Sequence, residues 1–201
     1  MRRFDFTATA SAAAVLALSA SYACAQEFVA HLTGFNEIGE ITGPYQMGDG
    51  FVYTGAILSP RTATAQLDLD QKAGVITYKL TYPDVSTTPL PTGTVTQAHI
   101  HFGKPHSSGA ILVFFCTNLG NGPAGTPPCP PNSGTVTGTW TKASVLAIPA
   151  QNVPANDFDA LVDALLSNTA YANIHTTAFP GGEIRGQCHA PDEEHDHHHG
   201  Q

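Results

Sequence analysis

The chain has 201 residues, of which 12% are charged and 42% are hydrophobic, and it contains 19 Gly and 15 Pro. About one residue in six is therefore Gly or Pro, which excludes long helices and coiled coils. The apolar content is too high for a disordered chain, so one domain with a real core is expected. The formal net charge is −8 and no basic cluster is present, which argues against nucleic acid as a partner.

Residues 1–25 have the pattern of a secretory signal peptide. Two Arg residues supply a positive start, an apolar stretch follows, and residues 23–25 (Ala-Cys-Ala) form a small-x-small cleavage site. The apolar stretch ends at this site rather than at a stop-transfer sequence, so no transmembrane segment is expected. Cys24 also allows a lipid anchor, although the residues before it make a poor lipobox. We predict cleavage after Ala25 and a periplasmic or secreted protein.

From residue 28 onward, short alternating segments separated by turns predict an all-β fold. The strongest hairpin pairs 62–69 with 75–82 across a turn that contains a Gly. Strand spacing and β-branched content predict an antiparallel β-sandwich or barrel. The expected strands are 28–32, 51–58, 62–69, 75–82, 94–102, 110–116, 134–141, 171–176 and 183–188.

Two segments depart from this pattern. Residues 156–167 place apolar side chains at helical spacing, so we predict one short amphipathic helix there, with Asn156 as its N-cap. Residues 190–201 are acidic and rich in His, and we predict that this tail is disordered.

Three cysteines remain after removal of the signal peptide. Cys116 and Cys129 flank a loop rich in Gly and Pro, and in an oxidising compartment we predict a disulfide between them. Closing a loop of this size stabilises a fold by about 3 kcal/mol. Cys188 is left as a free thiol, an interchain disulfide partner or a metal ligand.

The histidines give the clearest indication of chemistry. His99 and His101 are two residues apart in an expected strand, which places both imidazoles on the same face. A third His from an adjacent strand completes a three-nitrogen site suited to copper or zinc, and His175 is the best candidate. The alternative is that these residues face solvent or hydrogen-bond the ends of strands.

Other residues are weaker candidates. His106 lies near the His-x-His motif, and the tail carries four more histidines, which either hold metal loosely or belong to a solubilising end. Glu183 and Arg185 share one face of the last strand and pair with each other or with neighbouring strands. We assign no catalytic residues. The secondary metal candidates are His106, His195, His197, His198 and His199.

Motifs spread along the chain resemble the chordin-type (CHRD) domain. Residues 28–37 resemble its opening Ala-x-Leu-x-Gly-x-x-Glu, and 97–103 resemble its central Ala-His-Ile-His-x-Gly. Residues 171–176 and 180–187 resemble its closing Tyr-x-Asn-Ile-His-Thr and Pro-x-Gly-Glu-Ile-Arg-Gly-Gln. The resemblance covers about residues 27–188 and implies a β-rich, secreted domain. The growth-factor antagonism of animal members is not carried over, because their Cys-rich modules are not seen here.

A shorter likeness concerns the site alone. The order of His-x-His, a later His, a Gly-rich turn and Arg185 is similar to that in copper/zinc superoxide dismutases, which are exported Greek-key β-sandwiches. The histidine and aspartate pattern of their zinc subsite is not visible in this chain.

These observations predict that residues 26–189 form an exported CHRD domain that binds a transition metal, copper before zinc, through His99, His101 and His175. A second hypothesis is an extracellular protein-interaction or matrix module without metal. A third is a superoxide dismutase-like enzyme in which Arg185 steers the anion.

Overall fold

The computed structural model describes residues 25–39, 55–83 and 92–191. The predicted signal peptide, apart from residue 25, and the His-rich tail from residue 192 lie outside the described residues. The expected strand at 51–58 is wrong in its second half, because residues 55–58 form no strand, and its first half is not described.

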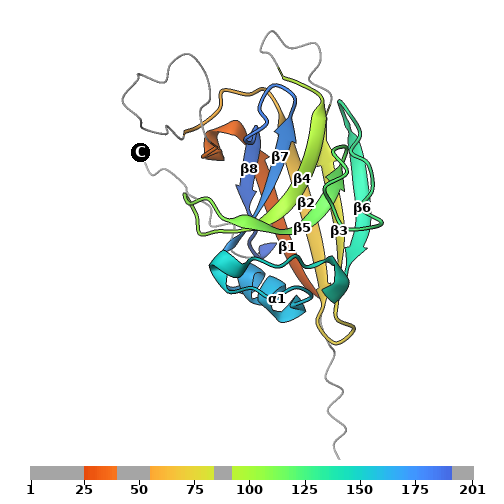
Figure 1. Cartoon of the computed structure of the whole chain (residues 1–201). Helices are drawn as coiled ribbons and strands as arrows, with labels where there is room; N and C mark the ends of the chain where they lie inside the picture. Colours follow the sequence, from red (N-terminus) through yellow and green to blue (C-terminus); the bar gives the residue numbers. More distant parts are fainter. Residues whose placement is uncertain (1–24, 40–54, 84–91, 192–201) are drawn as a thin grey trace, which may run out of the picture.

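Within the described residues, eight antiparallel strands make a single sheet (Figure 1). Their order in the sheet is β5-β4-β7-β8-β1-β2-β3-β6. The other eight expected strands are all confirmed, with bounds that differ by at most a few residues. The strands are β1 (Gln26–Thr33), β2 (Thr62–Asp70), β3 (Val75–Tyr82), β4 (Val95–Phe102), β5 (Ala110–Thr117), β6 (Gly134–Trp140), β7 (Ala170–Thr176) and β8 (Ile184–Gln187).

The two end strands of the sheet, β5 and β6, approach each other and nearly close a barrel. Trp140 at the end of β6 donates its indole N–H to the carbonyl of Phe114 at 2.8 Å. The hydroxyl of Tyr78 donates to the carbonyl of Phe115 at 3.0 Å, and its ring stacks on Trp140. These side-chain contacts join β5 to β6 along the seam, the line where these two strands face each other without backbone pairing. β7, β4 and β5 are neighbours in that order, and β5 faces β6 across the seam.

Alternation along the strands separates the interior of the barrel from its outer face. Leu67, Leu80, Ile100 and Ile174 point inward and are at most 1% exposed. On β2 and β3 the outward residues are exposed, as the alternating pattern predicted. On β4 and β7 the outward residues are largely buried as well, because loops cover that part of the sheet. This second buried layer is polar and contains the candidate site.

The predicted amphipathic helix is confirmed as α1 (Phe158–Leu166), and Leu161 and Leu165 lie on its buried face. The predicted N-cap is wrong. Asp157 caps the helix, with its carboxylate accepting from the N–H of Ala160 at 3.1 Å. Asn156 instead adopts a left-handed conformation with φ of 63°. None of the helices in the described ranges is long and apolar enough to cross a membrane.

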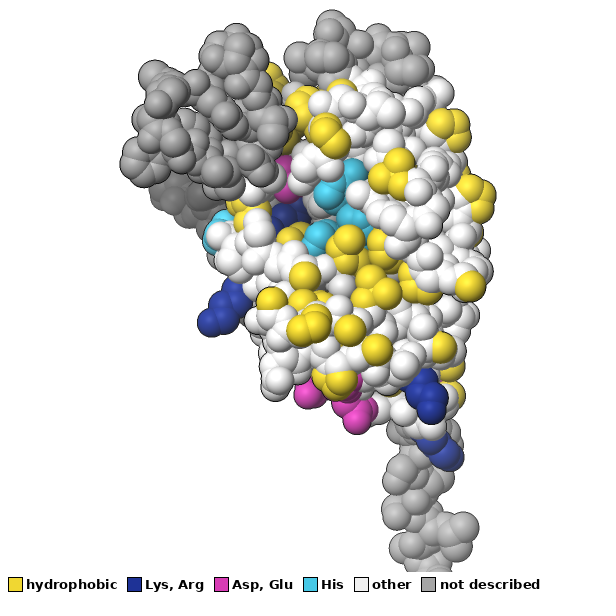
Figure 2. All heavy atoms as spheres, in the orientation of Figure 1, with side chains coloured by type: hydrophobic (Ala, Val, Ile, Leu, Met, Phe, Trp, Pro, Cys, Tyr) yellow, Lys and Arg dark blue, Asp and Glu magenta, His cyan; other side chains and the backbone are white. Residues whose placement is uncertain are grey.

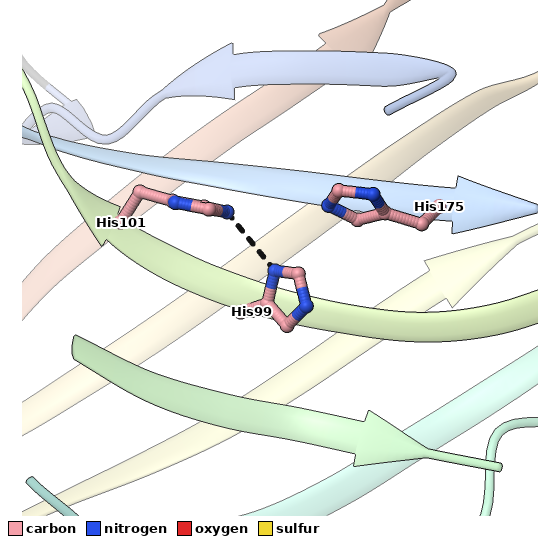
Figure 3. A group of neighbouring side chains, drawn as sticks. All are labelled: His99, His101 and His175. Atoms are coloured by element: carbon pink, nitrogen blue, oxygen red, sulfur yellow. Dashed lines mark hydrogen bonds between the residues drawn. The ribbon is translucent and has the colours of Figure 1, made fainter. Parts of the chain in front are cut away.

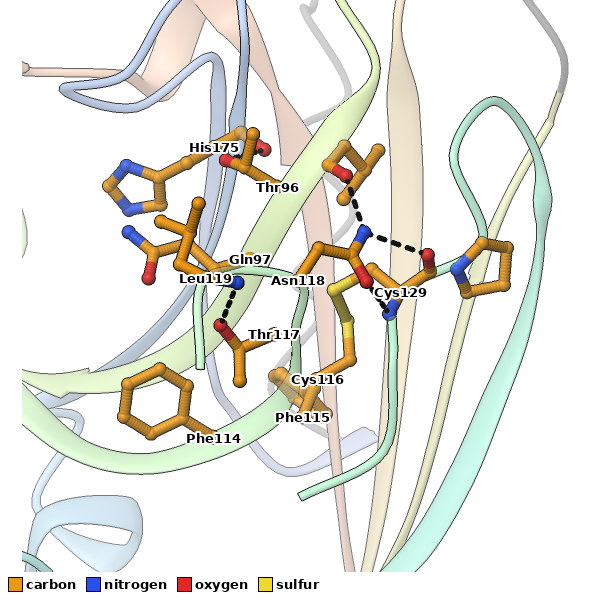
Figure 4. The surroundings of a disulfide bond; sticks show 12 residues. Thr96, Gln97, Phe114, Phe115, Cys116, Thr117, Asn118, Leu119, Cys129 and His175 are labelled. Atoms are coloured by element: carbon orange, nitrogen blue, oxygen red, sulfur yellow. Dashed lines mark hydrogen bonds between the residues drawn. A yellow bond between two sulfur atoms is a disulfide. The ribbon is translucent and has the colours of Figure 1, made fainter. Parts of the chain in front are cut away.

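The predicted disulfide joins Cys116 to Cys129 (Figure 4). The side chain of Asn118 stabilises the loop that this disulfide closes. It donates to the carbonyls of Val95 and Cys129 and accepts from the N–H of Cys129. Cys188 is a free thiol in the apolar core, and its complete burial raises its pKa to about 12. A core position excludes the interchain disulfide and the metal ligand considered for it.

Candidate metal centre

Three histidines meet on the outer face of β4 and β7 (Figure 3). His99 and His101 come from β4, and His175 comes from the neighbouring strand β7. Their sequence neighbours Ile100 and Ile174 point into the barrel, so alternation places the three imidazoles on the opposite side. The side chains are 0%, 9% and 7% exposed respectively. The structure therefore brings together the three residues that the sequence selected.

The ring nitrogens are close enough to approach a common point. One nitrogen from each ring can be chosen so that all three lie within 4.8 Å of one another. Nδ1 of His99 lies 3.0 Å from Nε2 of His101. Three ligands that bind one ion with bonds of roughly 2.1 Å lie about 3.4–3.6 Å apart in tetrahedral or trigonal geometry. A shared ion therefore requires the widest pair, at up to 4.8 Å, to close by about 1.2 Å.

Backbone carbonyls determine which nitrogens are available. Nδ1 of His101 donates to the carbonyl of Gly109 at 2.8 Å, and Nδ1 of His175 donates to that of Pro180 at 2.9 Å. A carbonyl only accepts, so both rings carry their proton on Nδ1 and keep a lone pair on Nε2. This is the arrangement in which metal-binding histidines are usually held.

Two buried ring nitrogens of the group are unsatisfied. Nε2 of His175 and Nε2 of His99 have no hydrogen-bond partner among the residues that the structure describes. Because Nε2 of His101 carries a lone pair, the 3.0 Å contact requires Nδ1 of His99 to donate to it. An ion shared by these two nitrogens requires His99 to carry its proton on Nε2 instead. A buried lone pair without a partner is costly, and a cation would satisfy that of His175, while Nε2 of His99 would still lack a partner.

The same burial keeps the three imidazoles neutral at pH 7. Desolvation lowers the pKa of His99 well below its usual value, and the neighbouring His101 and His175 lower it further. Desolvation also lowers the pKa of His101 to about 4, helped by His175 and Arg185 and opposed by the hydrogen bond to its backbone acceptor. Burial lowers the pKa of His175 as well. Neutral imidazole is the form that binds metal ions, so protons compete weakly at this site.

An aromatic ring and a guanidinium form the wall behind His101. The ring of Tyr171 stacks flat on this imidazole at 4.7 Å between centroids, and the guanidinium of Arg185 lies 3.4 Å from the centre of the Tyr171 ring. Arg185 also donates to the carbonyls of Lys104 at 3.1 Å and Ser107 at 2.9 Å. Figure 2 shows histidine side chains beside a basic side chain in a hollow of this face.

The motifs and the fold can be assigned to a known family. The model of the CHRD domain matches residues 28–188. The chain belongs to the CHRD domain family. No curated protein and no solved structure matches it, so the likeness to superoxide dismutases stays a prediction.

Within this CHRD domain, Glu183 and Arg185 do not pair with each other. Glu183 lies 3.4 Å from Nε of Arg61 and accepts from the hydroxyl of Ser59 at 2.6 Å. The exposed fractions of Arg61 and Glu183 are only 2% and 0%, so this is a buried ion pair rather than a surface one. The expected pair between them is therefore wrong. Arg185 contacts Tyr171 on the neighbouring strand β7, as expected, whereas the partners of Glu183 lie in the loop before β2 rather than on a strand.

The remaining predicted ligands are not part of the group. His106 lies on the exposed loop after β4 with a positive φ of 60°, outside the group formed by the other three. The four tail histidines, His195, His197, His198 and His199, lie beyond the described part of the chain.

Sequence reasoning missed several residues that build the CHRD domain site. Tyr171 supports His101, Gly109 orients it, and Asn173 donates to the buried carboxylate of Glu37 at 2.6 Å. A signal was available, because Tyr171 and Asn173 lie four and two residues before His175 and therefore share its face of the strand. A side chain at Gly109 would meet the carbonyl of Phe102, which explains why the loop has a glycine there.

Proposed function

We propose that this protein is an exported CHRD-domain module that binds one copper ion through His99, His101 and His175. The observation that carries the proposal is the convergence of three buried, neutral imidazoles whose ring nitrogens lie within 4.8 Å of one another. His101 and His175 are held by backbone carbonyls with Nε2 unprotonated, beside His99. Zinc is the alternative ion, since imidazole suits both metals.

The wider context supports export and a role in metal handling. A disulfide in a small domain is typical of an oxidising compartment, and the N-terminal sequence has the pattern of a signal peptide. In this proposal the tail histidines collect metal loosely, and the buried site stores or delivers it.

Metal analysis of a chain with a silenced tail tests the proposal. The tail-silenced chain carries Ser in place of His195, His197, His198 and His199, which removes the competing ligands. After loading and dialysis we expect one copper per chain, measured by mass spectrometry of the metal content. The substitution pair His99→Ala and His101→Ala should abolish it. His106→Ala, an exposed His outside the group, is the matched control and should retain it. Absence of stoichiometric metal, or equal uptake by the double variant, would contradict the proposal.

A protein-interaction module without metal is the second candidate. The carbonyl hydrogen bonds of His101 and His175 are compatible with a purely structural role. Nε2 of His175, a buried lone pair without a partner among the described residues, favours metal over this alternative. A dismutase-like reaction is less well supported, because the guanidinium of Arg185 is engaged by two carbonyls and an aromatic ring.

A further inference from the structure

We infer that this site takes copper as Cu(I), in preference to Cu(II) or Zn(II). The inference rests on the proposed function and specifies the ion. Its basis is the charge of the ligand group, the charges around it and the number of ligands available.

The ligand group carries no negative charge. In the part of the chain that the structure describes, the group consists of His99, His101 and His175, with no carboxylate or thiolate among them. The charge of a bound cation therefore stays uncompensated by its ligands. The cost of removing an ion from water grows with the square of its charge, so a divalent ion pays about four times the penalty of a monovalent one.

The charged residues around the three histidines do not compensate the charge of a bound ion either. Arg185 is positive and reaches the group through the ring of Tyr171. Glu37 is the buried carboxylate on this face, and it accepts hydrogen bonds from the side chain of Asn173 and the N–H of Ile38. Glu37 and Arg185 interact electrostatically with each other, so together they add no net negative charge.

The coordination number points the same way. Cu(I) can be three-coordinate, whereas Zn(II) completes a three-histidine site with a water as its fourth ligand and Cu(II) prefers a tetragonal set. The ring of Phe114 packs edge-on against His99 at 4.9 Å between centroids, and Tyr171 covers one face of His101. The faces of these rings supply no further ligand atom, so a divalent ion would need water ligands in addition to the three imidazoles.

One substitution changes the charge of the site with little change in shape. Gln97 lies two residues before His99 on the same face of β4 and is paired with His175 in the ladder (Figure 4). Its Oε1 accepts from the side chain of Asn121 at 2.9 Å, and a carboxylate can accept the same bond. Gln97→Glu should therefore strengthen Cu(II) and Zn(II) binding relative to Cu(I) by about tenfold, by simple Coulomb attraction. Gln66→Glu adds the same charge on exposed β2 and is the matched control.

The test measures three affinities on the full chain with the tail silenced as above. Cu(I) is titrated without oxygen against bicinchoninate, and Cu(II) and Zn(II) are titrated against chromophoric chelators. We expect one Cu(I) per chain, bound more tightly than either divalent ion, with the preference reduced in Gln97→Glu and unchanged in Gln66→Glu. Thermal melting checks that both variants are folded.

The outcomes separate the two proposals. Tighter stoichiometric binding of Cu(II) or Zn(II), lost in the His99→Ala and His101→Ala double variant, would overturn the Cu(I) assignment and leave a metal site in place. An unchanged preference in folded Gln97→Glu would also overturn the charge argument. Failure to bind any of the three ions would remove the proposed function itself.

Discussion

Acid should destabilise the metal-free protein through its buried histidines, and the contribution of His101 can be given a magnitude. Burial lowers the pKa of this imidazole from 6.5 to about 4 in the folded protein. Because the unfolded chain binds the proton first, the contribution is fully present above pH 6.5 and is lost as the pH falls towards 4. A shift of this size corresponds to about 3 kcal/mol of unfolding free energy between pH 7 and pH 4.

The variant His101→Phe tests this contribution, because it keeps a ring against Tyr171 and removes the titrating group. It also removes the effect of His101 on the pKa of His99, which changes the curve in the same direction. Urea unfolding in the presence of a chelator gives the free energy of unfolding at each pH. Between pH 7 and pH 4 the free energy of unfolding of the variant should fall by about 3 kcal/mol less than that of the parent. This holds for any difference in stability between the two proteins at pH 7. Glu37, whose pKa burial raises, contributes with the opposite sign in both proteins and cancels in the difference. Parallel curves for parent and variant would refute the reasoning, and His106→Ala should run parallel to the parent.

Three further predictions concern parts of the fold around the site. Replacing Cys116 and Cys129 by Ala should lower the free energy of unfolding by about 3 kcal/mol, because the disulfide closes a loop between residues 13 apart. A loss below 1 kcal/mol in urea unfolding would contradict this. Glu183→Gln should cost about 3–5 kcal/mol, because it leaves the buried guanidinium of Arg61 without its counter-charge. Chemical denaturation measures the loss, and a change within error would show that the pair contributes nothing. Cys188 should resist iodoacetamide at pH 8 in the folded protein and react fully in urea, since burial raises its pKa to about 12; rapid labelling of the folded chain would show that it is accessible.

Local patterns in the sequence were sufficient to predict most elements of this CHRD domain. Strict alternation defined the hairpin of β2 and β3, and helical spacing located α1. The N-cap was missed because Asp157 and Asn156 are both good capping residues, and the backbone conformation decides between them.

The order of strands and the closure of the seam depend on long-range contacts that alternation does not encode. Selection of His99, His101 and His175 needed only the period of a strand, but their approach depends on the register of β4 against β7. The carbonyls of Gly109 and Pro180, which orient two of the rings, belong to loops whose path no local pattern determines.

The seam between β5 and β6 also supplies a built-in optical reporter. Trp140 is the single tryptophan of the chain, and it lies at this seam with its indole N–H bonded to the carbonyl of Phe114. Its emission therefore comes from the junction between the two end strands rather than from the histidine face. A shift of the Trp140 emission spectrum during gentle denaturation would report when β5 and β6 separate. Metal loss could be followed independently.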